Sequence, residues 1–369
     1  MKKMTIMIKP ASSACNLSCD YCFYKDEASL RNIAIHPFIT EEILELSLEK
    51  FFENTTEEID FVFQGGEPSL VGLDWFKLFI ELEEKHNKNK IKTKHSFQTN
   101  GTQIDQNWAE FFHDQNFLVG ISFDGTRQLQ DFQRPTVKGG KSSKMVIDGM
   151  KILRENDVDY NILTVVTNTL AENLDSVWNF LSKQHCDFFQ FIPCLDPLEG
   201  KTNRFLSPKV YGSFLIRLFD KWYASLREDS FSIRLFDNFL NILLNNEPEA
   251  CDMLGHCSVQ YVLEGNGSIY PCDFYCLDDM CLGNIKESKI VDMDQKRKEI
   301  HFIENSFNKT NDCQNCDYFA LCRGGCKRYR DNEGKFRFCE SYIMLFDNRI
   351  RRFMEIANFI RKQQKKTLR

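Results

Sequence analysis

The sequence predicts an α/β fold, a partial (β/α)6 barrel followed by a smaller cysteine-rich domain that binds metal. Two observations support this prediction. In the first two thirds of the 369 residues, short β-rich runs alternate with helical patterns six times, at intervals of about 30 residues. Such alternation is typical of a parallel sheet with right-handed crossovers, and six units are fewer than the eight of a closed barrel. Later in the chain, cysteines and turn residues become dense, as expected of a domain held together by metal.

The six units are predicted from hydrophobic period and from signals at element ends. Thr40 is a candidate N-cap of the first helix, with Glu42 in its first turn. The predicted strands are Thr5–Lys9, Ile59–Phe63, Lys94–Gln98, Leu118–Ser122, Tyr160–Val166 and Phe188–Ile192. The predicted helices are Thr40–Phe52, Leu73–His86, Asp105–Asp114, Ser142–Asn156 and Glu172–Lys183.

The pattern changes beyond the sixth strand. Pro208–Leu226 and Ile233–Asn246 predict helices that lead to the cysteine-dense segment from Cys251 to Cys339. Tyr342–Lys365, rich in Phe, Ile and Arg, predicts a last helix. We therefore expect a core over residues 1–235, a cysteine-rich domain over 236–345 and a C-terminal helix over 346–369.

Composition indicates a globular protein, with 42% hydrophobic and 27% charged residues. The net charge of −6 argues against nucleic acid or an anionic membrane as a partner, and we interpret the basic segment from Arg351 as a solvated helix end. No leader pattern begins the sequence and no run of about 18 apolar residues occurs, so we expect a cytoplasmic protein with no membrane partner. Fifteen cysteines in that reducing compartment favour metal ligands over disulfides.

The first three cysteines, Cys15, Cys19 and Cys22, are spaced C-x3-C-x2-C. Three thiolates on one short loop can hold three corners of a four-iron cluster and leave the fourth iron open to another ligand. A structural metal site would instead fill all its positions. Three ligands of a zinc site, or three unrelated buried cysteines, are the alternatives that the spacing alone permits.

Polar or glycine-rich signatures recur just after predicted strands, where parallel α/β folds bind ligands. They include the cysteine loop, Gly65-Gly66-Glu67-Pro68, Thr99-Asn100-Gly101 and Ser122-x-Asp124-Gly125. The two glycines would let the backbone approach a ligand, and Glu67 could orient its amino group. Ser122 and Asp124 could bind ribose or amino-acid groups, and Arg134 a carboxylate. Ordinary turn residues and a surface arginine are the alternatives.

The downstream cysteines are numerous enough for two more closed four-ligand sites. Cys313, Cys316, Cys322 and Cys326 form C-x2-C-x5-C-x3-C, with Cys339 after them and Cys251, Cys257 and Cys272 before them. Two zinc sites are the alternative, but the first loop favours iron–sulfur clusters. The remaining cysteines, interpreted as core or free thiols, are Cys186, Cys194, Cys276 and Cys281.

Together these motifs resemble the radical S-adenosylmethionine (SAM) enzymes that carry a cysteine-rich SPASM domain, and among them the anaerobic sulfatase-maturating enzymes. The resemblance spans nearly the whole chain. The segments that carry it are Ile8–Ser13, Cys22–Tyr24, Phe63–Pro68, Gln98–Gly101, Phe191–Pro197 and Tyr270–Tyr275. One segment departs from the family: its Asp-Gly-Pro and following histidine are replaced here by Asp124-Gly125-Thr126 and Gln130, which affects the expected local substrate contacts.

The resemblance implies a partial (β/α)6 TIM barrel, a C-terminal SPASM domain, SAM and three [4Fe–4S] clusters. The SAM cluster would be held by Cys15, Cys19 and Cys22, one auxiliary cluster by Cys251, Cys257, Cys272 and Cys326, and the other by Cys313, Cys316, Cys322 and Cys339. The residues in contact with SAM would be Tyr21, Gly66, Ser122, Arg134 and Leu195. Asp273 would be the catalytic proton acceptor.

The implied activity is oxidation of a cysteine or serine in a sulfatase polypeptide to Cα-formylglycine. One electron would cleave SAM to methionine and a 5′-deoxyadenosyl radical, which removes a hydrogen atom from the substrate Cβ. Asp273 would take the thiol or hydroxyl proton while the auxiliary clusters carry away the second electron. The expected partners are an unfolded or nascent sulfatase and reduced flavodoxin or ferredoxin as electron donor, and the expected oligomeric state is a monomer.

Two alternatives remain at the level of sequence. One is a related radical SAM/SPASM enzyme that crosslinks or epimerises a ribosomally made peptide. Such enzymes often carry an N-terminal peptide-recognition domain, for which the position of Cys15 leaves no room. The other is a non-catalytic iron–sulfur electron carrier, which would need neither an open iron nor the motifs for SAM.

Overall fold

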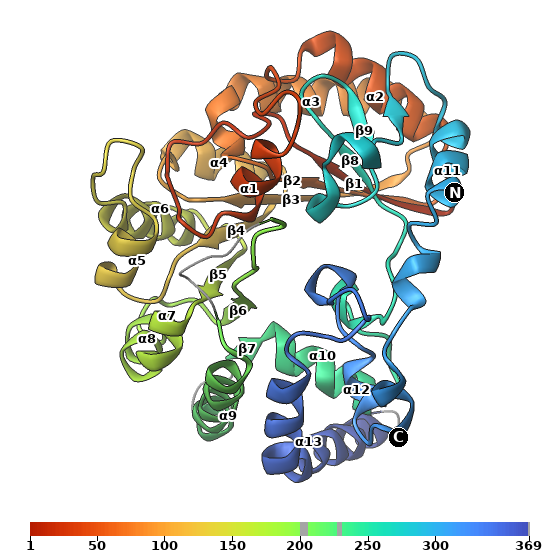
Figure 1. The fold of residues 1–369 in the computed structure, drawn as a ribbon. Helices are drawn as coiled ribbons and strands as arrows, with labels where there is room; N and C mark the ends of the chain where they lie inside the picture. Colours follow the sequence, from red (N-terminus) through yellow and green to blue (C-terminus); the bar gives the residue numbers. More distant parts are fainter. Residues whose placement is uncertain (200–205, 227–230, 368–369) are drawn as a thin grey trace.

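The computed structural model describes residues 1–199, 206–226 and 231–367. These residues form one ten-stranded sheet in the order β10-β9-β8-β1-β2-β3-β4-β5-β6-β7 (Figure 1). The strands are β1 (Lys3–Ile8), β2 (Glu58–Phe63), β3 (Lys92–Thr99), β4 (Leu118–Ser122), β5 (Tyr160–Val166), β6 (Phe188–Pro193), β7 (Ser232–Ile233), β8 (Tyr261–Leu263), β9 (Ser268–Tyr270) and β10 (Gly283–Asn284). From β1 to β6 each strand is parallel to the next, which confirms the predicted α/β architecture.

Helices cover the outer side of this sheet along an arc from α2 to α9 (Figure 1). The α-helices are α1 (Phe23–Ser29), α2 (Glu41–Glu53), α3 (Leu73–His86), α4 (Gln106–Asp114), α5 (Arg127–Gln133), α6 (Ser143–Glu155), α7 (Asn168–Glu172), α8 (Leu174–Leu181), α9 (Pro208–Ser225), α10 (Arg234–Leu243), α11 (Ile290–Glu299), α12 (Phe319–Cys322) and α13 (Cys339–Thr367). Thr40 caps α2 as predicted, because its side chain accepts a hydrogen bond from the Ile43 N–H.

Two predicted helices differ from the structure. The prediction of one helix from Glu172 to Lys183 is wrong, because this part of the chain forms two helices. Thr167 is the N-cap of α7, and Asn173 separates α7 from α8. The last helix begins at Cys339 rather than Tyr342, so a candidate cluster ligand lies in its first turn.

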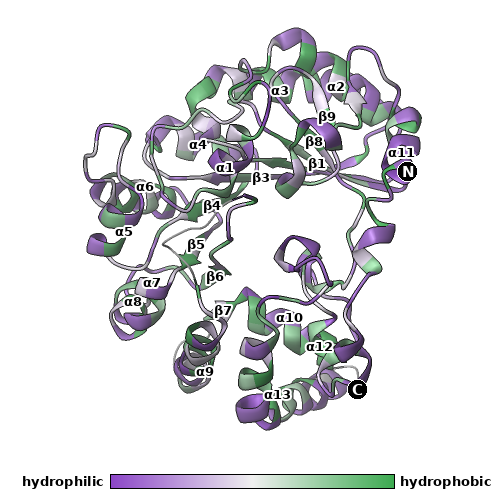
Figure 2. Ribbon diagram, in the orientation of Figure 1, coloured by the Kyte–Doolittle hydropathy of each residue, from purple (hydrophilic) through white to green (hydrophobic). Residues whose placement is uncertain are grey.

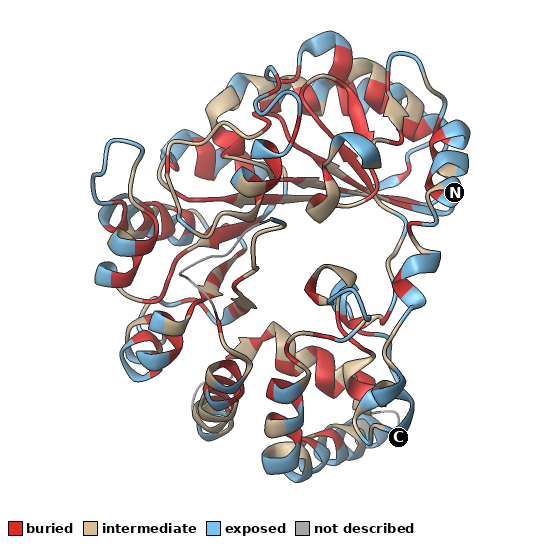
Figure 3. Ribbon diagram, in the orientation of Figure 1, coloured by how far each residue is buried: buried red, intermediate tan, exposed pale blue. Residues whose placement is uncertain are grey.

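Phenylalanine fills the layer between the sheet and the outer helices. Phe61 and Phe63 of β2 pack edge-on against Phe79 of α3, with ring centroids 5.2 and 4.9 Å apart. Figure 2 shows hydrophobic and hydrophilic stretches alternating along the outer helices, and Figure 3 shows buried residues in both the strands and these helices. This packed layer gives the loops that follow the strands a rigid base.

The cysteine-rich half of the chain is joined to the core at two places. Strand β8 extends the core sheet by pairing in parallel with β1, and the Lys9 N–H donates to the Leu263 carbonyl at 2.9 Å. At the other end of the arc, α13 packs on α9, where Met344 contacts Gly212 and Arg349 forms an ion pair with Asp220. No helix in the described residues is long and apolar enough to span a membrane.

Candidate active site

The loop that carries the first three cysteines connects β1 to α1 and is held against the glycines that follow β2. The Gly66 N–H donates to the Ser12 carbonyl at 2.7 Å, and the Glu67 N–H donates to the Ala14 carbonyl at 2.8 Å. A Cβ atom on Gly66 would lie 2.0 Å from the Ala14 oxygen. Gly66 therefore makes room for the cysteine loop, and its expected contact with SAM stays a prediction.

Glu67 ties the end of β2 to the end of β3 and is fully buried. Its Oε1 accepts from the Ser69 and Thr99 hydroxyls at 2.6 and 2.7 Å, and its Oε2 accepts from the Asn100 N–H at 2.7 Å. Burial raises the pKa of this carboxyl, against the effect of these donors. Because the carboxylate is fully buried among these donors, we assign Glu67 a structural role, and its expected contact with a ligand's amino group stays a prediction.

Asp124, just after β4, joins four segments around its buried carboxylate. Arg134 Nε and Gln133 Nε2 donate to Oδ2 at 3.0 and 3.1 Å, the Val165 N–H donates to Oδ1 at 3.1 Å, and the Tyr21 hydroxyl donates to Oδ2. Burial favours a neutral Arg134, but the Asp124 charge keeps its pKa well above the ordinary value. Arg134 is thus a buried, paired residue and not a surface arginine.

Gln130, the departure from the family pattern, supports this same loop. Its side chain is fully buried, where Oε1 accepts from the Asp124 N–H at 2.9 Å and Nε2 donates to the Ser142 hydroxyl at 3.2 Å. The change from histidine is therefore accommodated inside the protein. Of the other predicted SAM contacts, Ser122 ends β4 and accepts from Gln98 at 3.2 Å, and Leu195 follows β6 and packs against the core.

The three thiols of the first loop lie within electrostatic reach of one another. Burial is the larger cause, and with negative charge on neighbouring groups it raises the pKa of Cys15 to about 11 and that of Cys19 to about 12. Arg134 opposes this rise at Cys19 and Cys22. Iron binds thiolates, so cluster assembly here would release protons, and the nearby guanidinium favours the charged products.

Electrostatic effects connect several of the eight downstream cysteines within the predicted groups. After burial, the larger cause, negative charge on Cys326 and Cys251 raises the pKa of Cys272, and negative charge on Cys339, Cys313 and Cys316 raises that of Cys322. One group is Cys251, Cys257, Cys272 and Cys326, and the other is Cys313, Cys316, Cys322 and Cys339. Soft thiolate sets of four match the needs of an iron–sulfur cluster. In the part of the chain that is described, no three His, Cys, Asp or Glu side chains are close enough to hold a single metal ion.

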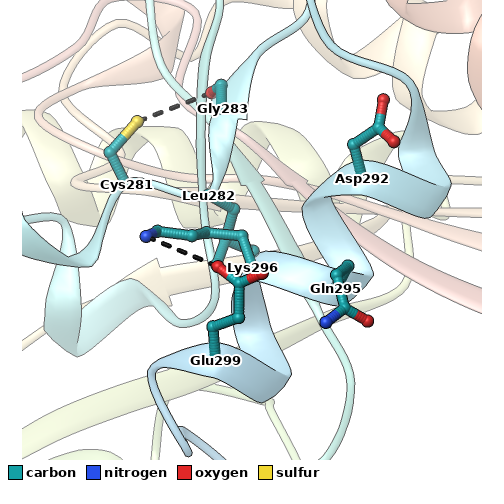
Figure 4. A pocket seen from close by; sticks show the side chains of 7 residues that line it. All are labelled: Cys281, Leu282, Gly283, Asp292, Gln295, Lys296 and Glu299. Atoms are coloured by element: carbon teal, nitrogen blue, oxygen red, sulfur yellow. Dashed lines mark hydrogen bonds and ion pairs between the residues drawn. The ribbon is translucent and has the colours of Figure 1, made fainter.

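The four remaining cysteines are not members of the predicted groups, although Cys276 Sγ donates to the Cys272 and Asp273 carbonyls at 3.7 and 3.6 Å. Cys186, Cys194 and Cys276 are buried, and Cys281 is half-buried. Cys281 lines an open pocket between β10 and α11, with Lys296 and Glu299 on its other side (Figure 4). That pocket contains none of the predicted site residues.

Asp273 lies directly after Cys272, and its carboxylate is held by residues that follow two core strands. Lys9, after β1, forms an ion pair with Oδ1, and Gln64, after β2, donates from Nε2 to Oδ2 at 2.9 Å. Asp273 is only 7% exposed. The predicted proton acceptor is therefore brought to the core motifs by two residues that the sequence analysis did not single out as site residues.

Lys9 is the centre of a buried group of charges. Its Nζ lies 3.3 Å from the centroid of the Tyr24 ring, and its side chain has no exposed area. The Tyr24 hydroxyl and Arg31 Nη1 both donate to Oε1 of buried Glu264. Burial favours a neutral lysine, but Asp273 and the other nearby acidic groups hold the pKa of Lys9 above its ordinary value. The lysine thus stays charged in the interior.

Glu27 of α1 is the unbalanced member of this group. Both of its oxygens are buried without a hydrogen-bond partner, and burial raises its pKa to about 8 although Lys9 opposes the rise. Because the folded-state pKa lies above that of an unfolded glutamate, this group costs no stability at low pH. Its cost grows as the pH rises from about 4.5 through 8.

We expect Glu27→Gln to remove this cost. Between pH 6 and 9 the wild type should lose about 1–3 kcal/mol more stability than the variant, because only the wild type must ionise a buried carboxyl. Anaerobic thermal unfolding across this pH range measures the difference. Glu81→Gln, at an exposed site on α3, is the control and should follow the wild type. Parallel pH profiles of Glu27→Gln and the wild type would contradict the assignment.

Comparisons with known proteins agree with this arrangement. The model of the radical SAM superfamily matches residues 10–183, and the SPASM model, an iron–sulfur cluster-binding domain, matches residues 255–317. A chain with both is a SAM-dependent iron–sulfur enzyme. The curated relatives include a cysteine-type anaerobic sulfatase-maturating enzyme of Clostridium novyi (strain NT), 40% identical over 99% of this chain and 100% of its own. A serine-type enzyme of Bacteroides thetaiotaomicron is 29% identical over 94% of this chain and 89% of its own.

Solved structures give the same result. Native anSMEcpe with bound AdoMet has a TM-score of 0.92 at 38% identity and covers 97% of this chain and 100% of its own. Native anSMEcpe with bound AdoMet and the Kp18Cys peptide has a TM-score of 0.91 at 38% identity and covers 96% and 99%. A relative that is 40% identical over almost the whole length of both chains shows the family. The chain therefore belongs to the anaerobic sulfatase-maturating enzymes, a SPASM-containing branch of the radical SAM superfamily.

Proposed function

We propose that this protein oxidises a cysteine of an unfolded or nascent sulfatase polypeptide to Cα-formylglycine. The observation that carries the proposal is the position of Asp273, a buried carboxylate beside Cys272 that is held at the ends of β1 and β2. A base beside Cys272, in contact with residues that follow β1 and β2, supports this proposal because the substrate thiol must lose a proton as well as electrons. Cysteine is favoured over serine because the cysteine-type relatives are 38–40% identical and the serine-type relatives 27–29%.

Asp273 can accept a proton in the geometry observed. Each carboxylate oxygen has two lone-pair positions, and Lys9 and Gln64 occupy one on each oxygen. One position per oxygen is therefore free for the substrate thiol. Lys9 and Gln64 fix the direction of the carboxylate, and its burial limits competition from water.

The cofactors fit the residues present, and we propose these assignments. The SAM cluster is held by Cys15, Cys19 and Cys22, and the auxiliary clusters by the two downstream groups of four. Tyr21, Gly66, Ser122, Arg134 and Leu195 surround SAM. When bound, SAM and its cluster supply the radical that removes hydrogen from Cβ, and the auxiliary clusters accept the second electron.

The partners and the domain limits are part of the proposal. We propose reduced flavodoxin or ferredoxin as the electron donor and a monomer as the working form. A cytoplasmic location suits fifteen cysteines that are all free of disulfides. The proposed limits are 1–235 for the radical SAM core, 236–345 for the SPASM domain and 346–369 for the C-terminal helix. The domain models match inside the first two ranges.

A synthetic sulfatase peptide of the form Cys-x-Pro-x-Arg tests the function. The reconstituted protein is incubated anaerobically with dithionite, SAM and the peptide. Mass spectrometry should show that the peptide loses about 18 Da. The cysteine side chain, CH₂SH, becomes an aldehyde, CHO, so the residue loses two hydrogens and one sulfur and gains one oxygen. A serine peptide, which would lose about 2 Da, should react more slowly.

The outcomes separate the rival functions. Peptide that stays unmodified beside abundant 5′-deoxyadenosine would contradict sulfatase maturation and indicate a different peptide-modifying activity. Absence of 5′-deoxyadenosine would exclude both enzyme readings. Faster conversion of the serine peptide would overturn the proposed cysteine preference.

A further inference from the structure

The side-chain amide of Asn100, in the loop after β3, faces the sulfur of Cys15. Its Nδ2 lies 3.7 Å from Cys15 Sγ and 2.7 Å from Asn16 Oδ1. Its Oδ1 accepts from the N–H and the hydroxyl of Thr102 at 3.0 and 2.7 Å. Because two donors bind the oxygen, the amide has one consistent orientation, with the NH₂ group toward the sulfur.

The backbone of Asn100 is also fixed. Its N–H donates to Oε2 of Glu67 at 2.7 Å, and Glu67 is itself buried and bound to Ser69 and Thr99. Asn100 is only 7% exposed. The amide therefore has neither the room nor a competing water shell to turn away from Cys15.

A donor so placed has a known effect on a cluster thiolate. Reduction adds negative charge to an iron–sulfur cluster, and hydrogen bonds to its sulfurs stabilise that charge and raise the reduction potential. Cys15 Sγ also accepts from the Leu17 N–H at 3.4 Å, so two donors are directed to this sulfur. The Leu17 donor is a backbone N–H that only proline would remove, whereas the Asn100 donor is a side chain that a matched substitution removes.

We propose that Asn100 is a positioning residue for the SAM cluster, whose amide N–H binds the Cys15 thiolate and raises the reduction potential of that cluster. The proposal rests on the proposed function to the extent that Cys15 is a cluster ligand. It makes the Thr-Asn-Gly loop part of the electron-transfer machinery. The competing interpretation is a purely structural link, in which Asn100 only ties the β3 loop to Asn16 of the cysteine loop.

Asn100→Leu tests the proposal because leucine has a similar size and no donor. Its cluster should have a more negative reduction potential than the wild type in an EPR-monitored redox titration without SAM. The triple variant Cys15→Ala/Cys19→Ala/Cys22→Ala identifies the EPR signal of the SAM cluster, because that signal should be absent from its spectrum. Asn16→Leu is the matched control. It removes the other acceptor of the same amide and a donor to the Thr102 hydroxyl but leaves the bond to sulfur, so its potential should stay unchanged.

A second variant covers the case in which Asn100→Leu fails to assemble its cluster. Thr102→Val keeps Asn100 but removes the hydroxyl that helps to orient its amide, so a smaller shift of the same sign is expected. In D₂O, ENDOR should detect the signal of an exchangeable deuteron near the cluster. This signal should be weaker in Asn100→Leu and unchanged in Asn16→Leu.

The result that overturns the proposal is an unchanged potential in Asn100→Leu and Thr102→Val at full iron content. An equal shift in Asn16→Leu would also overturn it, since that would indicate the structural link. If the triple cysteine variant retains all its iron, the ligand assignment itself fails, and with it the proposed function. If that variant loses about four irons and Asn100→Leu shows no shift in reduction potential, the proposed function is retained and only the inference about Asn100 is contradicted.

Discussion

Replacing Asp273 with asparagine is expected to lower formylglycine formation by at least about 100-fold while SAM cleavage continues. Asparagine keeps an oxygen that can accept from Lys9 or Gln64, so the local structure should persist. An amide cannot take the proton from the substrate thiol, however, and the oxidation stalls. The measurement is the ratio of formylglycine to 5′-deoxyadenosine, which should fall sharply.

The matched control is Asp279→Asn, which removes an exposed carboxylate six residues further on. Its product ratio should equal that of the wild type. Iron content must be equal in all three proteins, because Asp273 is next to the candidate ligand Cys272. Unimpaired product in Asp273→Asn would show that the proton leaves by another route and that Asp273 is not the acceptor.

The second large effect is expected at Lys9. Replacing it with methionine leaves Asp273 in the interior without its ion-pair partner, and breaking a buried pair in this way costs about 3–5 kcal/mol. We expect a lower stability and little product. The double variant Lys9→Met/Asp273→Asn should regain part of the stability, since it removes the stranded charge, but should remain inactive.

A double-mutant cycle of unfolding free energies measures this coupling. Lys3→Met, at the start of β1, is the control, because Lys3 pairs with Glu58 through a side chain that is 69% exposed. Its effect should be below about 1 kcal/mol. A double variant no more stable than Lys9→Met alone would contradict the pairing.

Most of the core fold could be predicted from the sequence. Strong period and end signals placed the six strands of the core, and the predicted Leu118–Ser122 and Tyr160–Val166 match β4 and β5. The strands β8 to β10 could not be predicted, because two or three residues are too few to show a period. The helices α1 and α5 were not predicted either, because seven residues make only two turns and give a weak helical period.

The site was predictable where the residue type carries the chemistry. Cysteines stand out in any sequence, and their two expected groups stay a prediction that the pKa effects at Cys272 and Cys322 support. The buried charges were different. Lysine and arginine are usually exposed, so a sequence pattern places Lys9 and Arg134 at the surface. Lys9 pairs with Asp273, which lies 264 positions away in the sequence. The one sequence signal for Lys9 was its place in the Ile8–Ser13 segment, which carries the family resemblance.

The pairing of β8 with β1 means that the cysteine-rich half is not a detachable module. Without β8, β1 would become the edge of a long sheet, with unpaired backbone donors and acceptors along one side. Lys9 would lose the Leu263 carbonyl and the Asp273 carboxylate together. The segment that carries the auxiliary cysteines thus also protects the core from intermolecular strand pairing, so shortening this enzyme from its C-terminal side would convert a redox defect into aggregation.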